Sequence, residues 1–161
     1  MEETLTGGIQ AIQAILAPAL GISATALLLL SLQNRYSLII NRIRLLNEER
    51  REFSLKLVEK NELGYNENIR HISVLNQIQK MLERCREVRN AIILIQISIL
   101  LFVATSVFIA LSLFVHSTLL GYLPLLSFVT GMIFVLAGVT FSARDVLNSY
   151  KVTEIEVKAD E

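Results

Sequence analysis

The stretch "NAIILIQISILLFVATSVFIALSLFVHSTLLGYLPLLSFVTGMIFVLAGVTFSA", residues 90 to 143, decides the class of this protein. It holds no Asp, Glu, Lys or Arg in 54 positions. A helix crosses the bilayer hydrocarbon with about 20 apolar residues, so this run is too long for one crossing. It divides at "HSTLLGYLP", residues 116 to 124, where Gly121 and Pro124 mark the turn region, although a proline just inside the first turns of the third span is also tolerated. We therefore expect two membrane spans, near 91–115 and 119–143.

A third apolar run lies near the amino terminus. No charged residue occurs between Thr4 and Asn34, and residues 9 to 32 are mostly apolar. As a helix these 24 residues extend about 36 Å, enough for a tilted crossing. A cleavable signal peptide is the alternative, but no basic stretch precedes the run, which is about twice the usual length of such a core. The sequence predicts a first membrane span here.

The composition agrees with an integral membrane protein. Of 161 residues, 53% are hydrophobic and only 19% are charged, which is too apolar for a soluble domain of this size. The single cysteine, Cys85, excludes a disulfide within the chain. We predict an all-α membrane protein with three transmembrane helices, the first two extended into a cytoplasmic antiparallel helical hairpin.

The distribution of charge predicts the orientation. Residues 35 to 89 hold twelve Lys or Arg and eight Asp or Glu, whereas only Glu2 and Glu3 precede the first span. The positive-inside rule therefore places the amino terminus outside and the carboxyl terminus in the cytoplasm of a multi-pass membrane protein. The expected division is 1–34 for the outer terminus and first span, 35–90 for the hairpin, 91–143 for the other spans and 144–161 for a cytoplasmic tail.

The segment between the first two spans has a coiled-coil pattern. Apolar residues recur at three- and four-residue spacing. They are Tyr36, Ile39, Ile43, Leu46, Phe53 and Leu57, with Arg50 in the same spacing, and then Val74, Ile78, Met81, Cys85, Val88, Ile92 and Ile95. The turn is expected in "NELGYNEN", residues 61 to 68, with Gly64 as a left-handed C-cap and Asn66 or Asn68 as the next N-cap.

Other apolar residues lie outside these two stripes: Leu38, Ile40, Leu45, Leu55, Ile69, Ile72, Leu75 and Leu82. Two helices cannot cover such wide apolar faces in water. The pattern favours further copies of the chain, and so a homo-oligomer, or a cytoplasmic protein partner. The alternative is that the aliphatic stems of Lys and Arg cover the excess.

Residue patterns of catalysis are absent from the sequence. It has no GxxxxGK[ST], HExxH or CxxC, and His71 and His116 belong to opposite ends of the predicted molecule. Glu48, Glu49 and Glu52 lie among arginines and indicate a solvated helix face. We expect no catalytic residue, no metal site, no cofactor and no nucleic-acid partner, and hence no enzyme.

The predicted spans carry small and neutral polar residues at helical spacing. The first span is the richest in them, with Gln10, Gln13, Ala17, Gly21 and Thr25. Such a row serves either close helix packing or, in a homo-oligomer, the lining of a pore. The lack of charge within the spans argues against active transport.

Basic residues gather at both predicted inner ends of the first two spans: Arg35, Arg42, Arg44, Arg84, Arg86 and Arg89. They are an orientation signal and an interfacial anchor. The further hypothesis is that this basic collar binds lipid headgroups, anionic ones in particular.

The motifs "QNRYSLIINRIRLLNEE", "LERCREVRNAIILIQISILLFV" and "FSARDVLNSYK" together resemble a family of small bacterial integral membrane proteins, domain of unknown function family 2721. The resemblance covers residues from about 17 to 150. An aspartate often precedes the Arg-x-Arg step in that family, and this chain has Asn41 there. The resemblance implies three spans in a bacterial inner membrane and implies no activity.

Two functions follow from these patterns. The first is a passive pore or ion channel formed by a homo-oligomer, because the spans are free of charge and carry neutral polar rows. The alternative is a membrane scaffold or signalling adaptor that binds a partner through its cytoplasmic helices.

Overall fold

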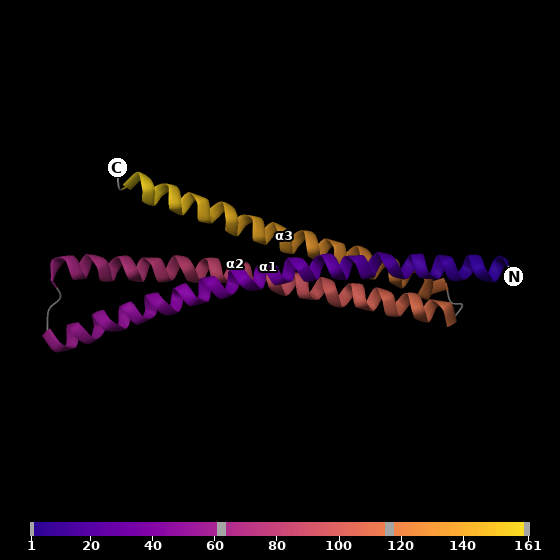
Figure 1. Ribbon diagram of the computed structural model, residues 1–161, viewed down its shortest axis with the longest axis horizontal. Coiled ribbons are helices and arrows are strands. Elements are labelled where there is room, and N and C mark those ends of the chain that lie inside the picture. Colours follow the sequence, from indigo (N-terminus) through magenta and orange to yellow (C-terminus); the bar gives the residue numbers. More distant parts are fainter. Residues whose placement is uncertain (1, 61–63, 115–117, 160–161) are drawn as a thin grey trace. The chain divides into compact units, whose positions relative to one another are not determined.

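The structure, a computed structural model, describes residues 2–60, 64–114 and 118–159, with side chains for 13–56, 64–65, 67–112 and 121–147. Three helices make up the described chain, and no strand occurs in it: α1 (Glu2–Lys60), α2 (Tyr65–Phe114) and α3 (Thr118–Ala159) (Figure 1). Each is long and apolar enough to cross a membrane, with windows of mean hydropathy between 2.1 and 2.7. The predicted all-α class with three spans is confirmed.

Helix α3 begins at Thr118, one residue before the expected start of the third span, so Gly121 and Pro124 lie inside its first turns. Pro124 is the seventh residue of α3 and lacks the N–H that would bond within the helix. In apolar surroundings a helix is still the backbone state that satisfies the remaining groups. The proline is therefore accommodated in the helix and does not mark its boundary.

The start of α2 also differs from its prediction. Gly64 precedes the helix, and its carbonyl accepts a bond from the Asn68 N–H at 2.9 Å. The Gly64 N–H donates to Glu67 Oε2 at 3.2 Å, which is the reciprocal half of a capping box. Gly64 is therefore the N-cap of α2 and has no left-handed backbone, while Asn66 and Asn68 lie within the helix. Residues 61–63 lie outside the described residues.

The chain divides into two compact units, and each helix contributes to both. The first unit comprises Met1–Leu32 and Asn90–Ala143, and the second comprises Gln33–Arg89 and Arg144–Glu161. The first unit has an apolar core of Leu32, Ala91 and Ile95, with partly buried neighbours from all three helices: Leu29, Ile92, Ile99, Val135 and Phe141.

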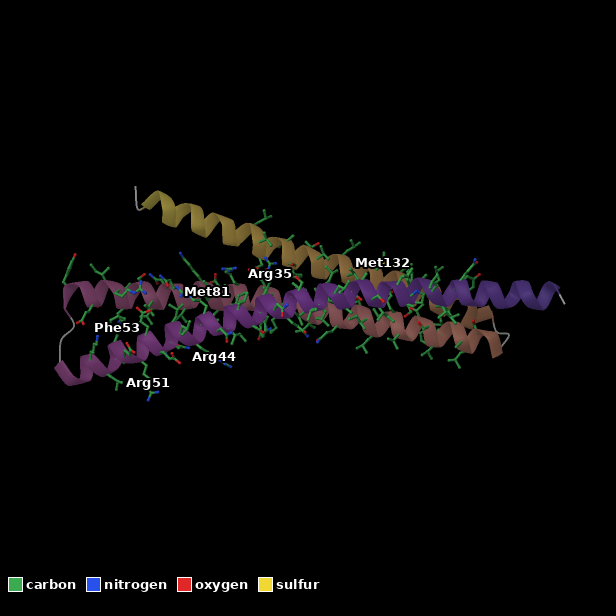
Figure 2. All side chains as sticks on the ribbon, viewed as in Figure 1. Arg35, Arg44, Arg51, Phe53, Met81 and Met132 are labelled. Atoms are coloured by element: carbon green, nitrogen blue, oxygen red, sulfur yellow. The ribbon has the colours of Figure 1, made fainter. Side chains whose placement is uncertain are left out.

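The second unit is built around an α1–α2 contact. Leu46, Val74 and Ile78 are its buried residues, and Phe53 on α1 and Met81 on α2 pack against them (Figure 2). Lys56 follows Leu46 on α1, and its Nζ lies 3.8 Å from Oε1 of Glu67, near the start of α2. The two segments therefore run antiparallel. Ile39 and Val88 are also buried, as the three- and four-residue spacing predicts. Arg50 shares that spacing but is exposed, because its charge keeps it in solvent.

Candidate functional site

The small-residue row of the first span splits into an inward and an outward part. Gly21 lies against the Phe102 ring of α2, where an added Cβ would be 3.2 Å from Cε2. Thr25 is buried, and its hydroxyl donates to the Gly21 carbonyl oxygen at 2.7 Å. Ala17 and Gln13 are exposed, and the side chain of Gln10 lies outside the described residues. The inward part therefore serves close approach of α1 to α2.

Polar side chains on the other two helices of this unit are also used in packing. Ser98 and Thr105 are buried, and their hydroxyls donate to carbonyls of their own helix. Ser127 of α3 donates to the Leu101 carbonyl of α2 at 2.9 Å, a hydrogen bond between helices. Gly131 lets the Phe102 ring approach α3. These hydroxyls have partners without water, as apolar surroundings require.

An apolar recess of about 280 Å³ opens on the first unit. It is lined by Ala14, Ala17, Pro18, Thr105, Ile109, Gly121, Pro124, Leu125 and Phe128. No charged side chain faces it, and the Thr105 hydroxyl already bonds to the Leu101 carbonyl. The recess is suited to hydrocarbon and offers no ligand set for an ion.

A buried ion pair joins α3 to α2 within the second unit. Arg84 Nε donates to Asp145 Oδ1 at 3.2 Å, and the Asp145 side chain is only 1% exposed against 30% for Arg84. Pattern reasoning assigned Arg84 to lipid headgroups and did not pair it, because 61 positions separate the two residues. The only signal was that Asp145 directly follows the third apolar run.

The other arginines of the basic collar are more open to contact. Arg35 is half-buried, while Arg42, Arg44, Arg86 and Arg89 are exposed. Arg44 points away from α2 in Figure 2. Four guanidinium groups are thus accessible to anionic groups, whereas Arg84 already has a carboxylate partner.

Another ion pair of the second unit joins α1 to α2. Arg70 donates through Nε to Glu49 Oε1 at 2.8 Å and through a terminal nitrogen to Oε2 at 3.2 Å. The hydrogen bonds from Arg70 lower the pKa of the Glu49 carboxyl below its ordinary value of 4.5, with the positive charge of Arg70 adding to the effect. The same contact raises the pKa of Arg70. Sequence patterns placed Glu49 on a solvated face and missed this partner on α2.

Among the side chains that the structure describes, no three His, Cys, Asp or Glu residues gather as a metal site. The described residues form a close-packed apolar unit and a helix pair with charged and apolar faces. Such a chain is a multi-pass helical membrane protein with an appended helix pair.

Its family follows from a direct comparison. Residues 15–155 match the family described as protein of unknown function (DUF2721), and the chain belongs to that family. Searches of curated proteins and of solved structures find no match to it.

Proposed function

We propose that the protein is a homo-oligomeric membrane scaffold of a bacterial inner membrane, with its second unit in the cytoplasm and no enzymatic activity. The observation that carries this proposal is the exposed apolar surface of the second unit. Leu38 is 69% exposed, Leu45 is 58% exposed and Leu82 is 52% exposed. Each such side chain gains roughly 1.5–3 kcal/mol when fully buried, so several together favour association.

The first unit favours a role in helix packing over a role in conduction. In the inner half of the row considered for a pore, Gly21 contacts Phe102 of α2 within a single copy, and Thr25 is buried. Their polar atoms are bonded to their own helix, so little of that row is left for a shared axis. The exposed amides of Gln13 and Gln96 are suited to hydrogen bonds with a neighbouring copy, which apolar surroundings favour.

Lipid contact is part of the same proposal. The exposed arginines of the collar, Arg42, Arg44, Arg86 and Arg89, are placed to bind headgroup phosphates on the cytoplasmic side, where each basic residue contributes about 1 kcal/mol. A cytoplasmic protein that docks on the assembled helix pairs is the partner such a scaffold would serve.

Light scattering of the purified full-length chain, with detergent and lipid mass subtracted, tests this function. We expect one discrete oligomer, and no conductance when the same protein is placed in planar bilayers. A monomer at concentrations where the protein is extracted from membranes would overturn the scaffold.

A pore is the second candidate function, and one observation favours it: Gln13 and Ala17 face outward from α1. In an oligomer these residues could line a short polar constriction. Conductance that falls in Gln13→Leu, but not in Ser23→Ala on the same helix, would establish the pore. Ser23 is a suitable control because its exposed hydroxyl bonds only to its own helix, at the Ala19 carbonyl.

A further inference from the structure

Two exposed leucine rows flank the α1–α2 contact of the second unit. On α1, Leu38 and Leu45 each come one position before a buried residue, Ile39 and Leu46. On α2, Leu75 and Leu82 each come one position after a seam residue, Val74 and Met81. We call these the α1 row (Leu38 and Leu45) and the α2 row (Leu75 and Leu82).

The two rows lie on opposite faces of the helix pair. Successive helical residues turn by about 100°. Because the helices are antiparallel, one step back along α1 and one step forward along α2 turn toward opposite faces. The Glu49–Arg70 ion pair lies on the face of the α1 row. On α1, Glu49 follows Leu45 by one turn. On α2, Arg70 comes one position before His71, whose ring contacts Phe53 on α1. Positions that follow the seam on α2 therefore lie on the other face.

The two rows also lie at similar levels along the axis of the helix pair. Leu46 lies in one buried cluster with Val74 and Ile78, so Leu45 lies within about two residues, or roughly 3 Å, of the level of Leu75. Leu38 lies seven residues before Leu45, and Leu82 lies seven residues after Leu75, which is about 10.5 Å in each case. Leu38 and Leu82 are therefore level as well.

In a membrane, the levels of these leucines restrict which residues of neighbouring copies can meet. All copies of a membrane protein insert with one orientation, so copies side by side keep the same residues at the same depth. We propose that the α1 row of one copy packs on the α2 row of the next copy, Leu38 with Leu82 and Leu45 with Leu75. Because the two rows face opposite ways, this contact is head-to-tail, and a rotation between neighbouring copies about the membrane normal closes it as a ring. The inference rests on the proposed scaffold and names its interface.

Charge supports the head-to-tail contact over a two-fold one. Arg42 is exposed between Leu38 and Leu45. In the head-to-tail contact it lies between the levels of Leu75 and Leu82 of the next copy and is not set against itself. A two-fold contact between α1 rows would instead set Arg42 beside the Arg42 of its neighbour at the same depth, and like charges repel.

Helix α3 leaves room for the neighbouring copy beside α1. Arg84 comes one position before Cys85, on the same face as the α1 row, and its partner Asp145 brings α3 over α2 on that face. The α1 row itself stays exposed, with Leu38 at 69% and Leu45 at 58%. A second copy can therefore reach α1 beside α3.

Cysteine cross-linking in membranes tests the ring. In a Cys85→Ser background, two chains with different tags are co-expressed, one with Leu45→Cys and one with Leu75→Cys. We expect a mixed disulfide between the tags, because the ring brings the two Cβ atoms within the roughly 4 Å that a disulfide needs. Leu55→Cys with Leu75→Cys is the matched control: Leu55 is also an exposed leucine of α1, at 60%, but belongs to neither row. No mixed disulfide is expected there.

The outcomes separate the ring from the scaffold. A disulfide between two Leu45→Cys chains in place of the mixed one, or an oligomer without any mixed disulfide, overturns the ring and leaves the scaffold standing. A purified chain that is monomeric overturns both.

Discussion

The sharpest prediction concerns the Phe102 ring, which lies between two glycines of the first unit. An added Cβ on Gly131 would be 2.9 Å from Cε1, while a Cβ on Gly21 would be 3.2 Å from Cε2. Ordinary contact begins at 3.4 Å, so Gly131→Ala requires a shift of about 0.5 Å, and Gly21 limits movement in the other direction. Overpacking of this kind costs roughly 1–3 kcal/mol, offset by up to about 1 kcal/mol of helix propensity.

We therefore expect Gly131→Ala to lower the free energy of unfolding by about 1–2 kcal/mol, measured by denaturant titration in detergent micelles. Gly121→Ala is the matched control on α3, because nothing lies within 4 Å of its added Cβ, and it should be neutral or stabilising. Phe102→Leu should partly rescue Gly131→Ala, although it is destabilising alone. Equal stability of the two alanine variants would refute the reasoning.

Three further predictions follow from single contacts. Asp145→Asn should cost up to about 3–5 kcal/mol by the same titration, since it leaves the Arg84 charge without its buried partner; a variant as stable as the wild type would show that the pair is not formed. The Glu49 pKa lies below 4.5, so the stability contributed by the Glu49–Arg70 pair is complete above pH 4.5 and is lost as pH falls through the lowered pKa. Because this pair is at the surface, the loss of stability should be small. It should be absent in Glu49→Gln when the melting temperatures of the two proteins are compared between neutral and acid pH. Ser127→Ala should cost about 0.6 kcal/mol by loss of its bond to α2, and a loss of several times that size would contradict a simple hydrogen bond.

Local patterns predicted the features that depend on local chemistry. The three spans were visible because bilayer hydrocarbon excludes charge over a whole helix length. The seam residues Ile39, Leu46 and Val74 were visible because burial repeats with the helical period. Both signals need only neighbours in sequence.

The rest depends on tertiary contact. No local pattern tells that Gly21 faces Phe102 or that Thr25 is buried, since a row of small residues fits a neighbouring helix and a pore equally well. The Arg84–Asp145 and Glu49–Arg70 pairs join residues far apart in the chain, so periodicity could not match them. At Pro124 the usual meaning of proline was overridden, because a helix satisfies the backbone best in apolar surroundings.

The most direct test of the scaffold is native mass spectrometry of the full-length chain released from lipid nanodiscs, run beside a variant with Leu38→Ser and Leu45→Ser. The account predicts a single closed oligomer of the wild type and smaller species for the variant, which lacks one side of the contact. A monomeric wild type, or an oligomer that the two substitutions leave unchanged, would contradict it.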